Sequence, residues 1–482
     1  MTRNRILFYL NFLFLFSCLQ NFTVARAQTP EIEVEMKIEG QTATISGHFA
    51  GGFVPRSGRN IAFKQNVEGD ARLAERVSRV EIWNDSTPVG VKRLMAGEYL
   101  AEGDFTRFAY RTDLTPPQNT AAMAHSSWLL ADSGVLMLDD LLPQFGKQTS
   151  AVVELRLPDG WTARYEGKSG DRFEIEDIAD GVIAAGSGLR MRPILSKKAK
   201  ADLVVSGKWH FTDEEAAQMA AEIFDEYSRL IGELPDRRYT VTIARSPATQ
   251  PTGTWQAETR GRSVLIVSSD MPFRTRSLQR LHEQLRHEIF HLWLPNGAGL
   301  TGDYAWFYEG AALYLSLKLG VQLNQIRFDD FLDTLSRAHT IDANSTPRKP
   351  LVGDRAADPT IRYARGMIVA FLADVRMLQE SKGKADINAA VGKMFERYRK
   401  GMAAADGTEA AVDLIGPGPI TESYVFGTAP VEWSEQIRAA GIGSRTEGRT
   451  TVLSVASKLN GRQKAILDSL GYNNWRKVGI KQ

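Results

Sequence analysis

Alternating apolar and polar residues dominate the first two hundred positions of the chain, and this period of two predicts β-strands. Turn sequences such as Pro158-Asp159-Gly160 separate the alternating segments. The strands expected from this pattern are 33–38, 42–49, 79–84, 152–157 and 172–178. We therefore expect an N-terminal β-domain over residues 28–195, which we interpret as a β-sandwich.

Near residue 200 the pattern changes, and strand-like segments begin to alternate with helix-like ones. Thr212 followed by Glu215 forms a capping box, which opens a helix running to about residue 232. A longer helix over 278–294 is stopped by Pro295 and by the Asn296-Gly297 pair. The strands expected between and before these helices are 202–211, 239–244 and 263–269. This part of the chain is predicted to be mixed α/β.

Beyond residue 309 the apolar residues recur at helical spacing almost to the end. The expected helices are 310–320, 329–339, 363–378, 387–399 and 431–441. Residues 446–482 are interpreted as one more helix and a basic tail. The fold class is therefore α+β, with a C-terminal helical domain over 376–482.

The first 27 residues have the features of a targeting segment rather than of a folded element. MTRNR carries two arginines and no acid, an apolar run follows it, and Ala25-Arg26-Ala27 is a small-x-small cleavage site. We expect a signal peptide over 1–27 and export to the periplasm or the exterior. An uncleaved N-terminal anchor, or a lipid on Cys18, is the alternative.

Cleavage would change the charge and the cysteine content. It removes Arg3, Arg5 and Arg26, so the formal charge goes from +2 to −1 (2 − 3). A slightly acidic chain argues against a nucleic-acid partner. Cleavage also removes Cys18, the only cysteine, so the mature chain could form no internal disulfide. No later segment is long and apolar enough to be a predicted membrane span.

The segment HEIFH at 287–291 carries the strongest chemical signal. His287 and His291 lie four residues apart, so a helix places both imidazoles on one face, where they can bind one zinc ion. Glu288 lies beside the first histidine and can act as general base toward a water on the metal. His282, five residues before His287, is expected off that face, as a solvated or supporting residue. The alternative is an ordinary amphipathic helix.

A catalytic zinc needs a third protein ligand and an open position. Glu309 is the candidate, because it lies between aromatic residues and an apolar helix, where an unpaired carboxylate would be costly. The alternative is a surface glutamate at the start of a helix.

HExxH followed by Trp306-Phe307-Tyr308-Glu309-Gly310 resembles the gluzincin metallopeptidases, the thermolysin-like clan that includes aminopeptidase N. Trp293 and Asn296 match a further element of that family. Seventeen residues separate His291 from Glu309 (309 − 291 − 1), one fewer than in the usual aminopeptidase N pattern. The glycyl aminopeptidase family is more similar, through the segments 363–367, 424–428 and 439–442. The resemblance covers roughly residues 150–445.

This resemblance implies a thermolysin-like catalytic domain, placed at 196–375, with one Zn²⁺ and a peptide or protein substrate. It also implies that Tyr363 donates a hydrogen bond to the oxyanion formed at the attacked carbonyl. The alternative for Tyr363 is a core aromatic residue at a helix start. The expected activity is peptide hydrolysis, aminopeptidase-like, by Glu288-assisted attack of a zinc-bound water.

One segment departs from the aminopeptidase pattern. Members of the clan place Gly-x-x-Glu before the metal helix, and its glutamate binds the amine of the substrate. Here the matching residues are Gly253 and Gln256, which we take as substrate contacts, and Glu258 lies two residues further on. A neutral amide captures an ammonium group less well than a carboxylate does. An endopeptidase, or a catalytically silent peptide-binding protein of the same fold, therefore remains open.

Overall fold

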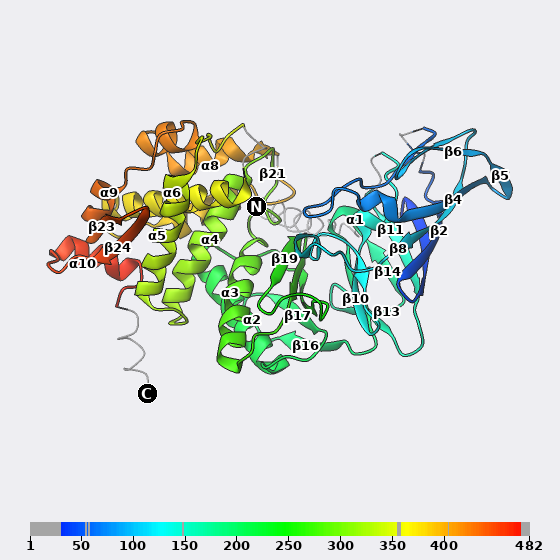
Figure 1. Cartoon of the computed structure of the whole chain (residues 1–482), viewed down its shortest axis with the longest axis horizontal. Helices are drawn as coiled ribbons and strands as arrows, with labels where there is room; N and C mark the ends of the chain where they lie inside the picture. Colours follow the sequence, from blue (N-terminus) through cyan, green and yellow to red (C-terminus); the bar gives the residue numbers. More distant parts are fainter. Residues whose placement is uncertain are drawn as a thin grey trace, which may run out of the picture.

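A computed structural model describes residues 30–53, 55, 58–146, 149–353, 358–402 and 404–473. Figure 1 shows an elongated molecule, with the N-terminal sheets at one end, the helices after residue 305 at the other, and a mixed sheet between them. The expected signal peptide, Cys18 and the end of the basic tail lie outside the described residues. In the described part of the chain, no helix has the length and apolar character that crossing a membrane requires.

A seven-stranded sheet forms the outer layer of the N-terminal part, in the order β14-β11-β1-β2-β8-β4-β5. Only β1 and β11 pair in parallel, and the other neighbours are antiparallel. The strands are β1 (Ile32–Glu39), β2 (Thr42–Phe49), β4 (Val77–Asn84), β5 (Thr87–Val89), β8 (Arg107–Asp113), β11 (Ala151–Arg156) and β14 (Arg172–Ile175). The alternation in β1, where Ile32, Val34, Met36 and Ile38 are buried, is the pattern read from the sequence.

A five-stranded sheet in the order β13-β12-β15-β10-β9 lies opposite, and its buried side chains join those of the first sheet in one apolar core. A small sheet, β3-β7-β6, is attached. The bounds are β3 (Asn60–Ala62), β6 (Val91–Met95), β7 (Glu98–Ala101), β9 (Trp128–Leu129), β10 (Ser133–Met137), β12 (Thr162–Tyr165), β13 (Lys168–Gly170) and β15 (Val182–Gly186). Short helical turns are η1 (Leu73–Arg76), η2 (Thr120–Ala122), α1 (Leu138–Leu141) and η3 (Ile178–Asp180).

The central sheet has the order β16-β17-β18-β20-β19, with β17, β18 and β20 parallel and β19 antiparallel at the edge. Its strands are β16 (Arg190–Ile194), β17 (Lys200–Val205), β18 (Arg238–Arg245), β19 (Trp255–Arg260) and β20 (Ser263–Ser268). Because β16 pairs with β17, this sheet begins before the division proposed at residue 195. Helix α2 (Asp213–Leu230) connects β17 to β18, and Thr212 and Glu215 form the capping box at its start.

Two helices carry the zinc motif. Helix α3 (Arg274–Phe290) packs against β19, β20 and α2, and it ends at His291 rather than continuing to Leu294 as expected. Helix α4 (Ala305–Gln322) follows after a short loop and packs against α3. Most of its residues are buried, which is the environment that its nearly unbroken apolar sequence predicts.

Of the remaining helices, α5 and α6 pack on α4, and most of the others pack around α6. They are α5 (Phe328–Asn344), α6 (Pro359–Glu380), α7 (Ile387–Arg397), α8 (Gly407–Ile415), the π-helical turn η4 (Ile420–Val425), α9 (Ser434–Ala439) and α10 (Gly461–Ser469). A pair of two-residue strands, β21 (Leu300–Thr301) and β22 (Ala405–Asp406), links the α3–α4 loop to this region. Besides β22, the expectation of helices in this region was wrong at residues 442–455, where β23 (Ile442–Glu447) and β24 (Thr450–Val455) form a hairpin packed on α5.

Helices α4 and α6 approach each other through two glycines. A Cβ on Gly310 would lie 2.4 Å from the carbonyl carbon of Gly366, and a Cβ on Gly366 would lie 2.1 Å from the Trp306 carbonyl oxygen. No other residue type fits either position without a shift of a backbone. This contact fixes α6 relative to Glu309, the residue that precedes Gly310.

Candidate metal centre and cleft

A cleft of about 1380 Å³ runs between α3, α4, α6 and the edge strand β19. It contains five of the residues predicted from the sequence, His287, Glu288, His291, Glu309 and Tyr363, and also Gln256. Gly253 is not among the residues that line it. It lies in the turn before β19 with a φ of +83°, a conformation that glycine adopts without strain.

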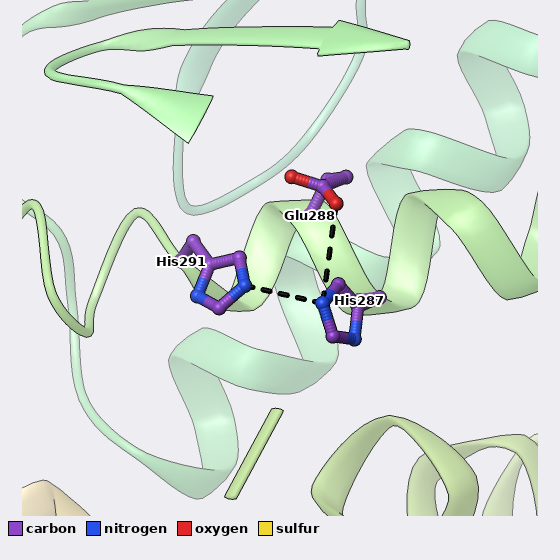
Figure 2. A group of neighbouring side chains, drawn as sticks. All are labelled: His287, Glu288 and His291. Carbon is purple, nitrogen blue, oxygen red and sulfur yellow. Dashed lines mark hydrogen bonds and ion pairs between the residues drawn. The ribbon is translucent and has the colours of Figure 1, made fainter. Parts of the chain in front are cut away.

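Three donor atoms converge at one point of the cleft. The Nε2 atoms of His287 and His291 are 3.2 Å apart, and Glu309 Oε2 lies 3.4 Å from the first and 3.6 Å from the second. Figure 2 shows the two imidazoles facing each other from successive turns at the end of α3, with the Glu288 carboxylate beside them. The carboxylate on α4 thus meets both rings, as the sequence predicted.

Neighbouring structure holds the second imidazole in one orientation. His291 Nδ1 lies 2.9 Å from the Leu294 carbonyl oxygen, to which it donates its proton, and Nε2 is thereby left as the electron-pair donor. The Asn296 side-chain amide donates to the carbonyls of His291 and Thr259, at 3.1 and 2.9 Å, and so ties the end of α3 to β19. Asn296 therefore has a structural role next to the site.

The donor set fits a zinc ion. In a tetrahedral site with bonds of about 2.0–2.2 Å, neighbouring ligand atoms are about 3.3–3.6 Å apart. The three separations of 3.2, 3.4 and 3.6 Å correspond closely to that geometry. Two neutral imidazoles and one carboxylate are also the ligand set of zinc sites that keep one position open.

Burial and charge prepare Glu309 to act as a ligand. Burial opposes ionisation of this carboxyl group, but the adjacent imidazoles of His291 and His287 outweigh it and hold its pKa well below the usual range. In the metal-free form, burial of His291 is likewise outweighed by Glu309, which raises the pKa of His291 to about 9. The carboxylate and the two rings therefore form one tightly coupled cluster.

Glu288 is buried and points at the same place. Its Oε1 lies 4.0 Å from His287 Nε2, and its Oε2 accepts a hydrogen bond of 3.0 Å from the Thr259 hydroxyl. Burial, the largest influence, raises the pKa of Glu288, although both histidines oppose the shift. One carboxylate oxygen is thus held by β19 and the other is left free beside the donor triangle. A raised pKa suits a group that must both take up and release a proton.

Tyr363 reaches the cleft from the first turns of α6, which Asp358 caps and Pro359 begins. Burial, together with the negative charges of Glu309 and then Glu68, raises the pKa of Tyr363 to about 12. Its phenol is therefore protonated at neutral pH and can donate a hydrogen bond. No described residue accepts a hydrogen bond from it, so the donor is available to a ligand.

Glu258 does not provide a free carboxylate in place of the missing glutamate. It lies in the cleft, but Arg260 Nε approaches Oε1 at 2.9 Å and His125 Nδ1 approaches Oε2 at 2.7 Å. Burial raises the pKa of Glu258, and these two partners outweigh it and lower the pKa overall. Gln256 lies two residues earlier on the same strand, and its side chain carries no charge. Neither Gln256 nor Glu258 therefore offers an unpaired negative charge.

Sequence reasoning missed several residues of the cleft. Glu68 and His125 come from the N-terminal part, where a lone histidine and an exposed acid give no local signal. Thr259 carries no motif either. Of the two alternatives given for His282, a solvated or a supporting residue, the solvated one is wrong, because His282 is 1% exposed and bonded to Arg286. Burial, followed by the Arg286 charge, lowers the pKa of His282 to about 3, so it is neutral.

Solved structures show which proteins share this architecture. The aminopeptidase N family protein from Idiomarina loihiensis matches 86% of this chain and 79% of its own length, with a TM-score of 0.69 and 14% identity. The chain has an aminopeptidase N fold. The M1 zinc metallopeptidase from Deinococcus radiodurans (TM-score 0.52, 14% identity, 83% of this chain and 94% of that one) is also similar. Native LTA4 hydrolase from yeast gives a TM-score of 0.50 at 14% identity, over 84% of this chain and 68% of its own.

Neither the family models nor the curated proteins give a match to the sequence. The similarity to the aminopeptidase N fold agrees with the coarse part of the α+β prediction, a chain that mixes helices and sheets. It also agrees with the gluzincin resemblance inferred from residues 287–310. At this level of identity the likeness concerns the fold, and the chemistry must be argued from the side chains of this chain.

Proposed function

We propose that this chain is a zinc-dependent metallopeptidase, aminopeptidase-like in fold, that hydrolyses peptide bonds. The observation that carries the proposal is the triangle of His287, His291 and Glu309 donor atoms, with Glu288 Oε1 4.0 Å from its nearest corner. The similar solved structures include M1 zinc metallopeptidases, which supports one Zn²⁺ here. Bound there, zinc would supply Lewis acidity toward the carbonyl and toward water.

The residues of the chain then have separate roles. Glu288 takes the proton of the attacking water at Oε1, while Thr259 holds Oε2 and so fixes the direction of the free oxygen. The same oxygen delivers the proton to the leaving amine. Tyr363, protonated and unpartnered, donates to the carbonyl oxygen as it gains negative charge.

The test is the Glu288→Gln variant, with zinc content and peptide hydrolysis measured on the same preparation. We expect about one zinc per chain in both proteins, and loss of most hydrolysis in the variant. General acid–base catalysis of this kind contributes about 10²–10⁴-fold. If the variant cleaves peptides as fast as the parent, Glu288 is not the base. If neither protein binds zinc, the silent peptide-binding alternative replaces the peptidase.

An aminopeptidase requires a free amino group on its substrate, whereas an endopeptidase does not. Gln256 is neutral, and Glu258 is already paired with Arg260 and His125, so both offer weak attraction to an ammonium group. Comparing kcat/KM for free and N-acetylated forms of one peptide tests this directly. We expect little penalty for acetylation, and a large preference for the free amine would support aminopeptidase action.

The place of action follows from the first 27 residues. We propose that they are removed on export and that the mature chain acts in the periplasm or outside the cell. We also propose the division into an N-terminal β-domain, a catalytic domain and a C-terminal helical domain. N-terminal sequencing of the protein recovered from its host tests the export proposal, because residue 28 should come first.

A further inference from the structure

Arg286 and His282 form a buried polar pair in the wall of the same cleft. Both line it, and they are 4% and 1% exposed. Arg286 Nη1 bonds to His282 Nδ1, and Arg286 Nε donates to the Ser316 carbonyl oxygen at 2.7 Å. None of the roles assigned above uses this pair, although Arg286 is adjacent to His287 in sequence.

The chemistry of the pair leaves two hydrogen-bond donors unused. A guanidinium can only donate, so His282 Nδ1 must accept, and the proton of the neutral ring therefore lies on Nε2. That Nε2–H is buried and has no partner among the described residues. Arg286 Nη2 likewise makes no hydrogen bond within the described ranges. Both unused groups need an acceptor, and one of them belongs to a permanent cation.

Among the described residues, the guanidinium has no carboxylate within ion-pair distance. No described carboxylate makes an ion pair with Arg286, in a chain where Arg260, Arg262 and Arg365 all have one. A buried charge without an opposite charge is costly. An oxyanion entering the cleft would supply the missing negative charge and an acceptor for Arg286 Nη2.

Resting on the proposed function, we propose that Arg286, oriented by His282, binds a carboxylate of the peptide substrate. The carboxylate accepts from Nη2 of Arg286, and His282 acts as a positioning residue through Nη1. Either an acidic side chain or the C-terminal carboxylate of the substrate offers this chemistry.

The position of the pair indicates how far this carboxylate lies from the cleaved bond. Ser316, which holds Arg286, is seven residues after Glu309 on α4 (316 − 309), or about 10 Å along the helix axis. An extended peptide advances about 3.3 Å per residue. The acidic group should therefore lie about three residues from the scissile bond.

A structural role is the competing explanation. The guanidinium lies against the last turns of α4, whose carbonyl end attracts cations. If Arg286 only stabilised this helix end, its removal would weaken all substrates equally. Selectivity for a carboxylate is therefore the measurement that separates the two roles.

The experiment measures peptide binding in the Glu288→Gln background, by fluorescence anisotropy with labelled peptides. One series places glutamate or glutamine at each successive position of an otherwise uncharged C-amidated peptide. A second compares the free C-terminal carboxylate with the amide. We expect about tenfold or tighter binding for a carboxylate at one position, as for a hydrogen bond to a charged group. Tighter binding in the first series would identify an acidic side chain as the bound group, and tighter binding in the second would identify the C-terminal carboxylate.

Arg286→Gln should abolish this preference while zinc content and binding of the uncharged peptide are kept. Arg276→Gln is the matched control, because Arg276 is an exposed arginine on the same helix and the same cleft. It should change the preference little. Gly320→Ala is a second test from another helix, since its Cβ would lie 2.9 Å from Arg286 Cζ and displace the guanidinium.

Three results would overturn the proposal: no carboxylate preference at any position, a preference that survives in both Arg286→Gln and Gly320→Ala, or equal weakening of charged and uncharged peptides. Binding does not depend on turnover. A protein that prefers carboxylates but hydrolyses nothing would refute the proposed function alone, and an active protein without the preference would refute only this subsite.

Discussion

The glycine contact between α4 and α6 allows a demanding test of how Tyr363 is positioned. We consider the Gly366→Ala variant, which adds one methyl group three residues after Tyr363. The added Cβ would lie 2.1 Å from the Trp306 carbonyl oxygen, in the turn of α4 that precedes Glu309. Because that oxygen belongs to a helix backbone, rotation of a side chain cannot relieve the overlap.

The size of the effect follows from the overlap. Ordinary contacts begin at 3.4 Å, so the helices must separate by about 1.3 Å (3.4 − 2.1). A misplacement of about 1 Å can cost about 100-fold in rate. Overpacking of this kind costs about 1–3 kcal/mol of stability. We therefore expect kcat/KM to fall about 100-fold, with zinc retained because His287, His291 and Glu309 lie on α3 and α4.

The assay combines zinc content, thermal unfolding and kcat/KM for one fluorogenic peptide. Gly392→Ala is the matched control. Gly392 lies on α7, outside the cleft, and its Cβ would lie 2.4 Å from the backbone oxygen of Ile231 at the end of α2. It should lose comparable stability and keep its activity. If Gly366→Ala is destabilised like the control but cleaves at the parental rate, the contact does not position Tyr363, and the catalytic role of that phenol is in doubt.

Three further predictions concern other parts of the site. Thr259→Val removes a hydrogen bond that lowers the pKa of Glu288, so kcat/KM should fall about tenfold and the acidic limb of its pH profile should move to higher pH. His125→Gln should lower the Tm most between about pH 4.3 and 6.5. Burial, the largest single influence, acts to lower the pKa of His125, but the hydrogen bond and charge of Glu258, with the charge of Glu68, together outweigh it and raise this pKa. The stabilisation by His125 is therefore complete below its unfolded pKa and is lost as pH rises through the folded one. Removing metal with a chelator should lower the Tm, and added zinc should restore it in the parent but not in His291→Ala.

The strands and the shared helix face of the two histidines were predictable because their signals are local or periodic. Alternation along β1 reports burial on one face, and the four-residue spacing of His287 and His291 reports a shared helix face. Glu309 was found through its apolar surroundings, an indirect sign of a buried partner. The β23–β24 hairpin was missed because it is held in place by packing on α5. A contact between segments far apart in the chain leaves no signal in a short stretch of sequence.

The rest of the cleft could not be predicted because it depends on contacts between distant segments. His125 reaches Glu258 across 133 positions of sequence, and neither residue has a neighbour in the chain that indicates the pairing. Thr259 reaches the Glu288 carboxylate only because β19 lies along α3. Helical geometry predicted correctly that His282 lies off the face of His287, but it could not show that this other face is buried. Arg286 and α4 cover it.

The charges along the cleft show an asymmetry that bears on substrate choice. On β19, Gln256 is neutral and Glu258 is compensated by two partners, so an ammonium group gains little there. On α3, the Arg286 guanidinium has no acid partner within the described residues, so a carboxylate gains both charge and hydrogen bonds there. On the proposed function and subsite, we expect such a cleft to select peptides by an acidic group away from the scissile bond more than by a free amine. An internal or N-blocked acidic peptide would therefore be cut at least as well as a free dipeptide.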